Sequence, residues 1–428
     1  MFFGLLDQLK KLKSPIKIGI VGVGTVGKGM VLQSSLTPGI ECVAIAGRHL
    51  DKAIEVAKQF NYNYKIVSNL SEMNEAIQNG QLAVCEDGDL VASCEQINVL
   101  VEATGSIVGG GLYAEMALDH NQHVVMMNCE ADLMYGSYLL SKAQRNNLVY
   151  TVCDGDQPAV IKRLADEIEF MGFKTVMAGN MKGFLDRYAT PYSIKEEAAK
   201  RNLNPKMCAS FTDGTKLCIE MAVIANGIGG YTATPGMYGP KMSNIHEIFD
   251  HFNFHQIWNG ENPIVDYVLG ARPYGGVFVI GYNDHPYQKS LMKILPQENG
   301  PGPFYLFYRP YHLVHFEFAA SVAEAALNNR AVLKPDFGSK TNVYAYAKKD
   351  LKKGETLDGL GGFGSYGLIE NCTDNKAKAG LPSCLAENVS LKRDIRKDEK
   401  IYLEDIEYDA NSDGFALFSK SLQAQSGI

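Results

Sequence analysis

The sequence of 428 residues lacks the features that mark membrane, secreted and nucleic-acid-binding proteins. It has no run of about 18 apolar residues, so no segment is expected to span a bilayer. Its nine cysteines include no Cys-x-x-Cys pair, which favours free thiols in a reducing cytoplasm over a zinc site or a disulfide framework. The net charge is −7 and the basic residues are scattered, so nucleic acid is not an expected partner.

We also expect neither a disordered segment nor a secretory signal in this sequence. No stretch is depleted enough in apolar residues to be disordered by composition. Lys10, Lys11 and Lys13 follow the apolar residues of the first segment, which is the reverse of the order in a secretory signal. We expect residues 1–13 to form a short amphipathic helix that packs against the body of the protein or a partner subunit rather than on a membrane.

A glycine-rich loop lies near the beginning of the sequence. The β-rich run 16–21 is followed by a G-x-G-x-x-G motif and then by a helix-compatible stretch. The first glycine permits a tight turn, the second lets the backbone approach a pyrophosphate, and the third lets helix and strand pack closely. The loop predicts a Rossmann domain that binds a dinucleotide. Its expected contact residues are Gly22, Gly24, Thr25, Val26 and Gly27.

The next strand bears on the choice of cofactor. The run 41–46 is followed by Gly47 and Arg48. These two residues lie about 20 residues beyond the loop, where the ribose-reading residue is expected. A carboxylate there would bind the ribose hydroxyl of NAD, whereas Arg48 with His49 beside it suits the extra phosphate of NADP(H). The alternative is that Arg48 is simply a solvated residue at a strand end. NADP(H) is the expected cofactor.

Two further apolar runs, 97–101 and 123–127, continue the alternation of strands and helices. This alternation predicts an α/β fold with a parallel, doubly wound sheet. Ligands bind outside the carboxyl ends of such strands, so the loops after the two runs should face the nicotinamide. Thr104, Gly105 and Asn128 are therefore further candidates for cofactor binding.

Charged residues concentrate between positions 180 and 220. The candidates for catalysis are Lys182, Asp186, Asp213, Lys216 and Glu220. The last three are spaced at three and four on a helix expected to begin near Thr212, so they should share one face. An exposed face laced with ion pairs is the alternative. The apolar residues around them favour burial, and buried charges need a purpose.

These residue types suit the reduction of a carbonyl group. Lys182 or Lys216 would donate a proton to the developing alkoxide. Asp186, Asp213 and Glu220 offer the hard oxygen ligands that Mg²⁺ or Mn²⁺ prefers, and such an ion would aid a carbon migration.

Substrate recognition is expected to involve an arginine. Arg187 and Arg163 are suited to hold a phosphate through paired hydrogen bonds. Glu130 follows Asn128 at the predicted nicotinamide edge and is a second candidate for contact with a small-molecule substrate.

The texture of the sequence changes from Leu333 onward to short β-like runs separated by turns. Residues 352–355 and 396–400 look like two variants of one turn, each before a strand. We expect a small β-rich domain that serves packing or oligomerisation. The alternative is a catalytic role, and the domain could also cover the site of a neighbouring subunit.

The order of several motifs resembles the homoserine dehydrogenase superfamily. The motifs are Glu102-Ala103-Thr104-Gly105, Asn128, Gly155-Asp156-Gln157-Pro158 and Gly179-Asn180-Met181-Lys182-Gly183. The resemblance covers most of residues 16–330. One position departs from it, because those dehydrogenases have a lysine directly after the asparagine and this chain has Cys129.

Other motifs look like a divergent branch of this superfamily, the deoxyxylulose-phosphate reductoisomerase-like proteins, which append a C-terminal antifreeze-like (SAF) domain. These motifs are the segments 128–132, 155–159, 185–191, 210–216 and 358–363. The resemblance implies three domains. They are a Rossmann domain at 1–160 completed by a return helix at 310–332, an α+β catalytic and dimerisation domain at 161–309, and a β-rich domain at 333–428.

The function that this branch implies is the NADPH-dependent reduction and rearrangement of a small phosphorylated keto-sugar, a step of isoprenoid biosynthesis. A cytoplasmic homodimer or homotetramer is the expected assembly. Two alternatives stay open. One is a homoserine-dehydrogenase-type oxidation, against which Cys129 speaks. The other is a non-catalytic nucleotide-binding scaffold, in which the charged cluster would be structural.

Overall fold

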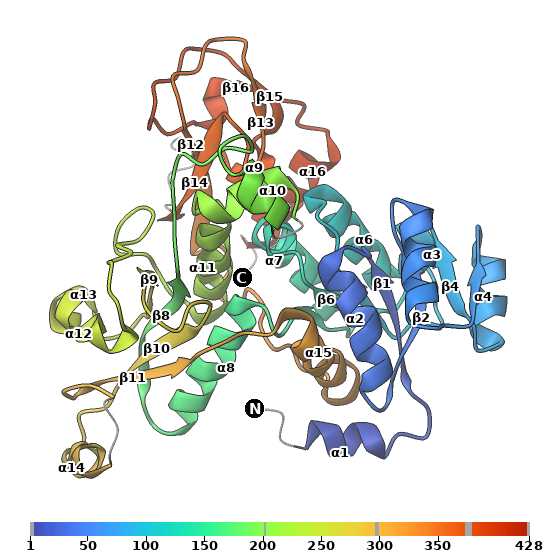
Figure 1. Cartoon of the computed structure of the whole chain (residues 1–428), viewed down its shortest axis with the longest axis horizontal. Coiled ribbons are helices and arrows are strands. Elements are labelled where there is room, and N and C mark those ends of the chain that lie inside the picture. The colour runs from blue at the N-terminus through green and yellow to red at the C-terminus, as the bar shows by residue number, and fades with distance from the viewer. Residues whose placement is uncertain (1–3, 201–202, 296–298, 373–378, 426–428) are drawn as a thin grey trace. The chain divides into compact units, whose positions relative to one another are not determined.

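The computed structural model describes residues 4–200, 203–295, 299–372 and 379–425. These residues fall into two compact units. The first comprises the chain up to Ala159, Leu313–Lys334 and the last part from Leu417, and the second comprises Val160–His312 and Pro335–Ala416. Figure 1 shows the chain and labels most of its helices and strands. Among the described residues, no helix combines the length and apolarity needed to cross a membrane.

The first unit is built on a seven-stranded parallel sheet with the order β3-β4-β2-β1-β5-β6-β7. Its strands are β1 (Ile16–Val21), β2 (Ile40–Ala46), β3 (Tyr64–Ile66), β4 (Leu82–Cys85), β5 (Val99–Glu102), β6 (His123–Met126) and β7 (Tyr150–Val152). Every neighbouring pair is parallel, so the carboxyl ends of all strands lie at one edge. The order reverses between β1 and β5, the switch point at which such sheets bind ligands. The predicted doubly wound, Rossmann-type fold is confirmed.

Helices connect these strands and cover the sheet. They are α2 (Thr25–Leu36), α3 (Leu50–Gln59), α4 (Leu70–Gln78), α5 (Gly88–Ala92), α6 (Ile107–Asp119) and α7 (Cys129–Arg145). Ile18, Ile20 and Val101 are fully buried, as expected of parallel strands covered on both faces. The predicted amphipathic helix at the start of the chain is α1 (Leu5–Lys10), and Leu5 and Leu9 pack into the same core.

A later helix also belongs to the first unit. α15 (Val314–Asn328) buries Phe318 and Val322 in the core of the seven-stranded sheet. It ends at Asn329, whose left-handed backbone (φ 50°) is a common helix terminator. Two of the four boundaries between the units fall within helices, α8 (Gln157–Phe170) and α16 (Asp413–Gln425), and the other two lie just before and shortly after α15.

The second unit contains a four-stranded sheet with the order β11-β10-β8-β9. Its strands are β8 (Lys174–Lys182), β9 (Ile264–Leu269), β10 (Val277–Tyr282) and β11 (Phe304–Arg309). β8 is parallel to β9 and antiparallel to β10. The helices of this unit are α9 (Lys195–Lys200), α10 (Pro205–Thr212), α11 (Thr215–Ile228), α12 (Ile248–His251), α13 (Phe254–Ile257) and α14 (Pro286–Ile294).

The C-terminal strands form two small antiparallel sheets in the same unit. One pairs β12 (Thr341–Ala347) with β14 (Ser365–Asn371), and the other joins β13 (Thr356–Asp358), β15 (Glu387–Leu391) and β16 (Ile406–Glu407). The sequence suggested a separate domain from residue 333, whereas these strands cluster with the middle segment. The reason is α11, which contacts both β8–β9 and β12–β14 and is buried along its whole length from Leu217 to Gly227. A helix whose residues are mostly apolar on every face needs cover on every side.

Candidate cofactor and catalytic sites

The glycine loop at the end of β1 has the geometry of a pyrophosphate cradle. Gly22 adopts φ +102°, and a Cβ on it would lie 2.5 Å from the backbone of Ala103. A Cβ on Gly27 would lie 1.8 Å from the Gly22 carbonyl oxygen, so strand and helix touch there. A Cβ on Gly24 would meet nothing within 4 Å. The second glycine therefore faces open space, and the residues present fit a dinucleotide.

The N-terminus of α2 supplies the donors for that cradle. Gly24 is its N-cap residue, and no side chain caps the helix. The first backbone N–H groups of the helix, those of Thr25 and Val26, are thus available to an anion, which the helix dipole also favours.

Arg48 emerges at the same edge of the sheet as the glycine loop. Val21 of β1 pairs with Ala46 of β2, so the residues after both strands are neighbours. Arg48 is exposed, and within the described part of the chain its side chain makes no hydrogen bond or ion pair. Its guanidinium is available for a phosphate.

Asn128 gathers the remaining predicted cofactor residues into one loop cluster. Its Oδ1 accepts the Ala131 N–H (3.0 Å) and so caps α7, while its Nδ2 donates to the carbonyls of Thr104 (3.2 Å) and Ser106 (3.0 Å). Gly105 lies between those two residues, and a Cβ on it would meet nothing within 4 Å. The structure therefore brings Thr104, Gly105 and Asn128 together at the carboxyl edge of β5 and β6. The side chain of Asn128 therefore holds the backbone of this loop in place.

Two buried carboxyl groups behind this edge were not singled out from the sequence. Glu102 ends β5, is fully buried, and accepts the Thr104 N–H at Oε1 (2.8 Å). Burial raises the pKa of Glu102 to about 8. Burial also raises the pKa of Asp132 to about 7, and the Tyr150 hydroxyl donates to its Oδ1 (2.7 Å). Both acids sit at strand or helix ends that the sequence had identified, but their burial depends on distant packing.

The two residues that follow Asn128 also lie near this edge. Glu130, a predicted substrate residue, is half-buried in the first turn of α7. The thiol of Cys129, at the position where homoserine dehydrogenases carry a lysine, is fully buried and donates to Asp156 Oδ2 (3.0 Å). Cys129 therefore offers no cation to a substrate.

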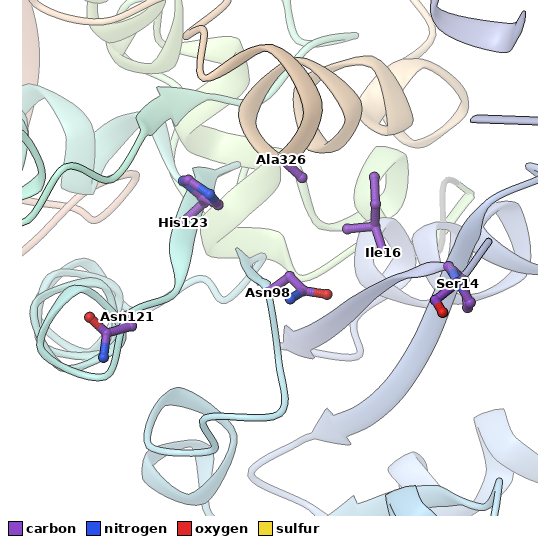
Figure 2. Close-up of a pocket in the computed structure, with 7 residues that line it drawn as sticks. Ser14, Ile16, Asn98, Asn121, His123 and Ala326 are labelled. Carbon is purple, nitrogen blue, oxygen red and sulfur yellow. The ribbon is translucent and has the colours of Figure 1, made fainter. Parts of the chain in front are cut away.

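A pocket of about 270 Å³ opens at the opposite edge of the same sheet (Figure 2). Ile16 and His123 begin β1 and β6, and Asn98 directly precedes β5, so the pocket lies at the amino ends of the strands. Dinucleotides bind at the carboxyl ends. This pocket is therefore not the cofactor site.

In the second unit, Lys182 and Glu220 form the clearest candidate for chemistry. Lys182 ends β8 with 19% of its side chain exposed, whereas Glu220 lies within α11 with 6% exposed. Lys182 Nζ is 4.0 Å from Glu220 Oε2, which also accepts a hydrogen bond from Asn180 Nδ2 (3.4 Å). The arrangement holds a partly exposed ammonium against a buried carboxylate, which suits proton donation. Asn180 was visible in a quoted motif but had no assigned role.

Asp213 does not share a helix face with Lys216 and Glu220, contrary to the prediction. The helix begins at Thr215, and Asp213 instead follows the last residue of α10. Gly214 between them has φ +86°, a left-handed conformation that ends one helix and starts the next. Lys216 lies in the first turn of α11 and is half-buried.

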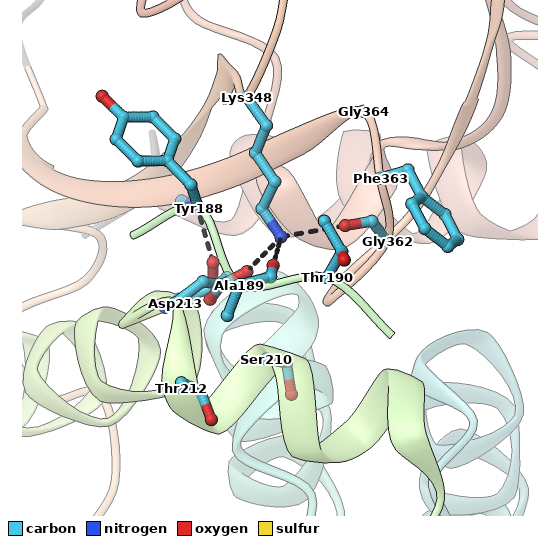
Figure 3. A network of polar contacts seen from close by, with 12 residues as sticks. Tyr188, Ala189, Thr190, Ser210, Thr212, Asp213, Lys348, Gly362, Phe363 and Gly364 are labelled. Carbon is cyan, nitrogen blue, oxygen red and sulfur yellow. Dashed lines mark hydrogen bonds and ion pairs between the residues drawn. The ribbon is translucent and has the colours of Figure 1, made fainter. Parts of the chain in front are cut away.

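Asp213 is the partner of a buried lysine that sequence reasoning missed. Lys348 Nζ lies 2.8 Å from Asp213 Oδ2, and the two side chains are 3% and 0% exposed. The same ammonium donates to the carbonyls of Ala189 (2.6 Å) and Gly362 (2.8 Å), as Figure 3 shows. Burial raises the pKa of Asp213, and Lys348 acts in the opposite direction. Asp213 is thus engaged in packing rather than presented to a ligand.

The predicted metal ligands do not come together. Asp186 is exposed on a loop, where its Oδ1 accepts the Tyr188 N–H (3.1 Å). Asp213 is paired with Lys348, and Glu220 with Lys182. Within the described ranges, no group of three or more His, Cys, Asp or Glu side chains is arranged to hold a metal ion. The residues present do not fit a protein-held Mg²⁺ or Mn²⁺, because their carboxylate oxygens are paired with lysines or accept backbone hydrogen bonds.

The Rossmann-type sheet with its glycine cradle, and a lysine backed by a buried acid, are features of an NAD(P)-dependent oxidoreductase. Comparison with known families agrees: residues 155–318 match the family described as the catalytic domain of oxidoreductase DRL. Residues 6–89 match shikimate / quinate 5-dehydrogenase. The chain is thus similar to oxidoreductases over residues 155–318, and its first unit has the Rossmann-type fold of a dinucleotide-binding domain.

Individual proteins are similar at a lower level. Homoserine dehydrogenase of Bacillus subtilis (strain 168) is 27% identical over 245 residues, which are 55% of this chain and 53% of that protein. The chain thus spans about half the length of this relative. A solved homoserine dehydrogenase from Thiobacillus denitrificans has a TM-score of 0.46 at 16% identity, covering 80% of this chain and 84% of that one. A probable dehydrogenase from Thermotoga maritima has a TM-score of 0.42 at 9% identity, covering 74% and 90%.

Proposed function

We propose that this chain is an NADPH-dependent reductase or reductoisomerase of a small phosphorylated keto-sugar. The observation that carries the proposal is the Lys182–Glu220 pair, which lies in the segment similar to an oxidoreductase catalytic domain. Carbonyl reduction needs a proton donor at the oxygen that becomes a hydroxyl. Lys182 would donate that proton, because part of its side chain is exposed. Glu220, oriented by Asn180, would hold the ammonium in place.

The cofactor, when bound, supplies the hydride. Gly22, Gly24 and Gly27 leave room for its pyrophosphate, and Arg48 has a guanidinium without a protein partner among the described residues. That cation supports NADPH over NADH, because only NADPH carries a phosphate on the adenosine ribose. The loop around Gly105, held by Asn128, would contact the nicotinamide.

The phosphate of the substrate is assigned to Arg187. This residue is exposed on the loop after β8, which also carries Lys182 at its end. A guanidinium can bind two phosphate oxygens at once, which fixes the orientation of a small substrate. No step of the proposed reaction is routed through a metal ion, because the acids that the sequence suggested as ligands are otherwise paired.

The direct test is to follow NADPH consumption by the purified protein with deoxyxylulose phosphate, with and without Mg²⁺. Turnover supports the proposal, and analysis of the carbon skeleton of the product separates plain reduction from reduction with rearrangement. Lys182→Met serves as the matched negative control. Absence of turnover by the wild type with any phosphorylated keto-sugar would overturn the proposal.

A second candidate function is the oxidation of homoserine or the reduction of aspartate semialdehyde. The similarity to the Bacillus subtilis homoserine dehydrogenase supports it. Cys129 speaks against it, since its thiol is buried where the resembling enzymes have a lysine. Activity on aspartate semialdehyde alone would favour this candidate. Cofactor binding without turnover of any substrate would favour the non-catalytic scaffold.

We also propose a homodimer or homotetramer in the cytoplasm. All nine cysteines are free thiols and eight of them are buried, which suits a reducing compartment. α14 has no buried residue, and its large side chains Tyr287 and Ile294 are 65% and 75% exposed. Such apolar exposure supports self-association. Light scattering of the wild type and of Ile294→Glu tests it, and a monomeric wild type would overturn it.

A further inference from the structure

We infer that the turn Arg396–Lys400, together with Lys348, positions the loop that presents Arg187, so that the C-terminal strands set the affinity for the substrate. The inference rests on the proposed function, in which Arg187 binds the substrate's phosphate. It assigns a role to residues 396–400, one of the two similar turns in the C-terminal part of the sequence.

The loop of residues 186–190 is exposed at three consecutive residues, Asp186, Arg187 and Tyr188. Its backbone forms a tight turn, in which the Ala189 N–H donates to the Asp186 carbonyl (3.0 Å), and the Asp186 N–H donates to the carbonyl of Thr212 (2.8 Å) at the end of α10. These two bonds leave Arg187 and Tyr188 without a backbone hydrogen bond to another described segment. An arginine on such a loop holds a phosphate through paired hydrogen bonds only when the loop backbone is fixed. The loop therefore needs anchors from elsewhere in the chain.

The first anchor is the buried ammonium of Lys348. It donates to the carbonyl of Ala189 (2.6 Å) while it is paired with Asp213 (2.8 Å). Figure 3 shows the Lys348 side chain reaching the loop and the end of α10 at one point. Because the pair is buried, this end of the loop is tied to the junction of α10 and α11.

The second anchor is Asp398. The hydroxyl of Tyr188 donates to its two carboxylate oxygens (3.0 and 2.9 Å), and Lys397 Nζ lies 3.8 Å from the centre of the Tyr188 ring. Asp398 Oδ1 also accepts the hydroxyl of Tyr366 on β14 (2.9 Å). One carboxylate thus joins the loop to the C-terminal sheet.

Arg187 itself lies against that sheet. Its guanidinium carbon is 5.4 Å from the centre of the Tyr366 ring, a cation–π arrangement that leaves the N–H edges open to a ligand. Tyr188 and Tyr366 meet edge to face at 6.2 Å. The same tyrosine therefore supports both Arg187 and its neighbour.

The turn that carries Asp398 is rigid enough to act as a support. Asp398 has φ +64°, and its N–H donates to the carbonyl of Ala347 (2.9 Å), the residue before Lys348. The Lys397 N–H donates to Asp350 Oδ1 (2.8 Å). The two anchors are thus adjacent in space and held by the end of β12.

The matched pair Tyr188→Phe and Tyr366→Phe tests the inference. Each removes one hydroxyl from the same carboxylate, but only Tyr188 lies on the loop. We expect Tyr188→Phe to raise the substrate KM about tenfold, the effect of one lost hydrogen bond to a charged group. The KM for NADPH, kcat and thermal stability should stay unchanged. Tyr366→Phe keeps the ring under Arg187 and leaves Asp398 bound to Tyr188, so it should raise the substrate KM less than Tyr188→Phe does.

A double variant separates positioning from direct contact. If Tyr188 acts through Arg187, Tyr188→Phe should have no further effect on the substrate KM in an Arg187→Ala background. An equal effect in both backgrounds would overturn the inference.

Hydrogen exchange of the loop amides gives a readout that does not depend on activity. We expect faster exchange of residues 186–190 in Tyr188→Phe and in Asp398→Asn, which keeps a residue that tolerates the positive φ. Unchanged exchange in both variants would overturn the inference even if the enzyme is active. A wild type that turns over no phosphorylated substrate would overturn the proposed function, and the exchange result would still decide whether the turn holds the loop.

Discussion

Buried acidic side chains are stabilised in different ways in the two units. In the first unit, Glu102 and Asp132 pair with no cation among the described residues, and burial raises their pKa values to about 8 and about 7. In the second unit, Glu220 and Asp213 lie beside Lys182 and Lys348. A carboxyl group without a cation is most stable with its proton on, whereas a paired one depends on its lysine. The first unit should therefore respond to pH, and the second to the loss of a single amine.

The two lysines of the second unit also differ from each other. Lys182 is partly exposed beside its acid at 4.0 Å, whereas Lys348 is buried with three oxygen partners. Exposure suits an ammonium that exchanges protons with a substrate, and burial suits one that holds segments together. We therefore expect Lys182 to act in the chemistry and Lys348 to stabilise the packing.

The largest expected effect is on activity when Lys182 is lost. Lys182→Met should lower kcat by roughly 10²- to 10⁴-fold, the usual contribution of a positioned proton donor. Steady-state NADPH oxidation measures it. Lys174→Met on the exposed start of the same strand is the control and should keep full activity. A Lys182→Met variant with wild-type kcat would remove Lys182 from the proposed mechanism.

Loss of Lys348 should instead reduce stability. Lys348→Met leaves Asp213 buried without its partner, which costs about 3–5 kcal/mol of unfolding free energy. Urea unfolding followed by circular dichroism measures it. Lys352→Met breaks an ion pair with Asp394 that is exposed on both sides, and its midpoint should not move. If both variants unfold at the same urea concentration, the buried pair is not the structural anchor described above.

The pH dependence of stability should come from the first unit. The pKa of Glu102 is raised from 4.5 to about 8, so the folded chain keeps a proton that the unfolded chain releases. The unfolding free energy should therefore fall as pH rises from about 4.5 to about 8. Below this range both the folded and the unfolded chain carry the proton, so the unfolding free energy no longer depends on the pH through Glu102. Asp132 adds a smaller effect of the same sign up to about pH 7.

Glu102→Gln should flatten this profile, because the amide carries no titrating proton. Urea midpoints across the pH range measure it. Glu55→Gln, at an exposed position of α3, is the matched control and should retain the wild-type slope. A slope that is unaltered in Glu102→Gln would mean that another group causes the dependence.

The smallest effect is expected for the choice of cofactor. Arg48→Ala should raise the KM for NADPH by roughly ten- to a hundredfold, since it removes a charge-assisted hydrogen bond, and should leave the KM for NADH unchanged. His49→Ala, its exposed neighbour, is the comparison variant. A preserved preference for NADPH in Arg48→Ala would place phosphate recognition elsewhere.

The sequence predicted well those features that depend on local spacing. The glycine loop, the parallel sheet and the helix α1 follow from short patterns, because turn geometry and periodic burial act over a few residues. The helix face of Asp213, Lys216 and Glu220 was wrong because one left-handed glycine, Gly214, interrupts it. A charge spacing alone does not reveal such a break.

Contacts between distant segments could not be predicted. Nothing near Asp213 in the sequence indicates Lys348, because the pair forms only when β12 lies against α11. Two of the proposed metal ligands, Asp213 and Glu220, failed for the same reason, since each is paired with a lysine from another segment. Glu102 stood in a quoted motif, yet its burial depends on the strands on both sides of it.

The helix α11 has a consequence for how this protein can be divided. It is covered on one side by β8 and β9 and on another by β12 and β14. A truncated protein that ends before β12 would expose a continuous apolar surface from Leu217 to Gly227 and should aggregate. We therefore expect the middle segment and the C-terminal strands to unfold in one cooperative transition, and insertions or fusions to be tolerated only outside them.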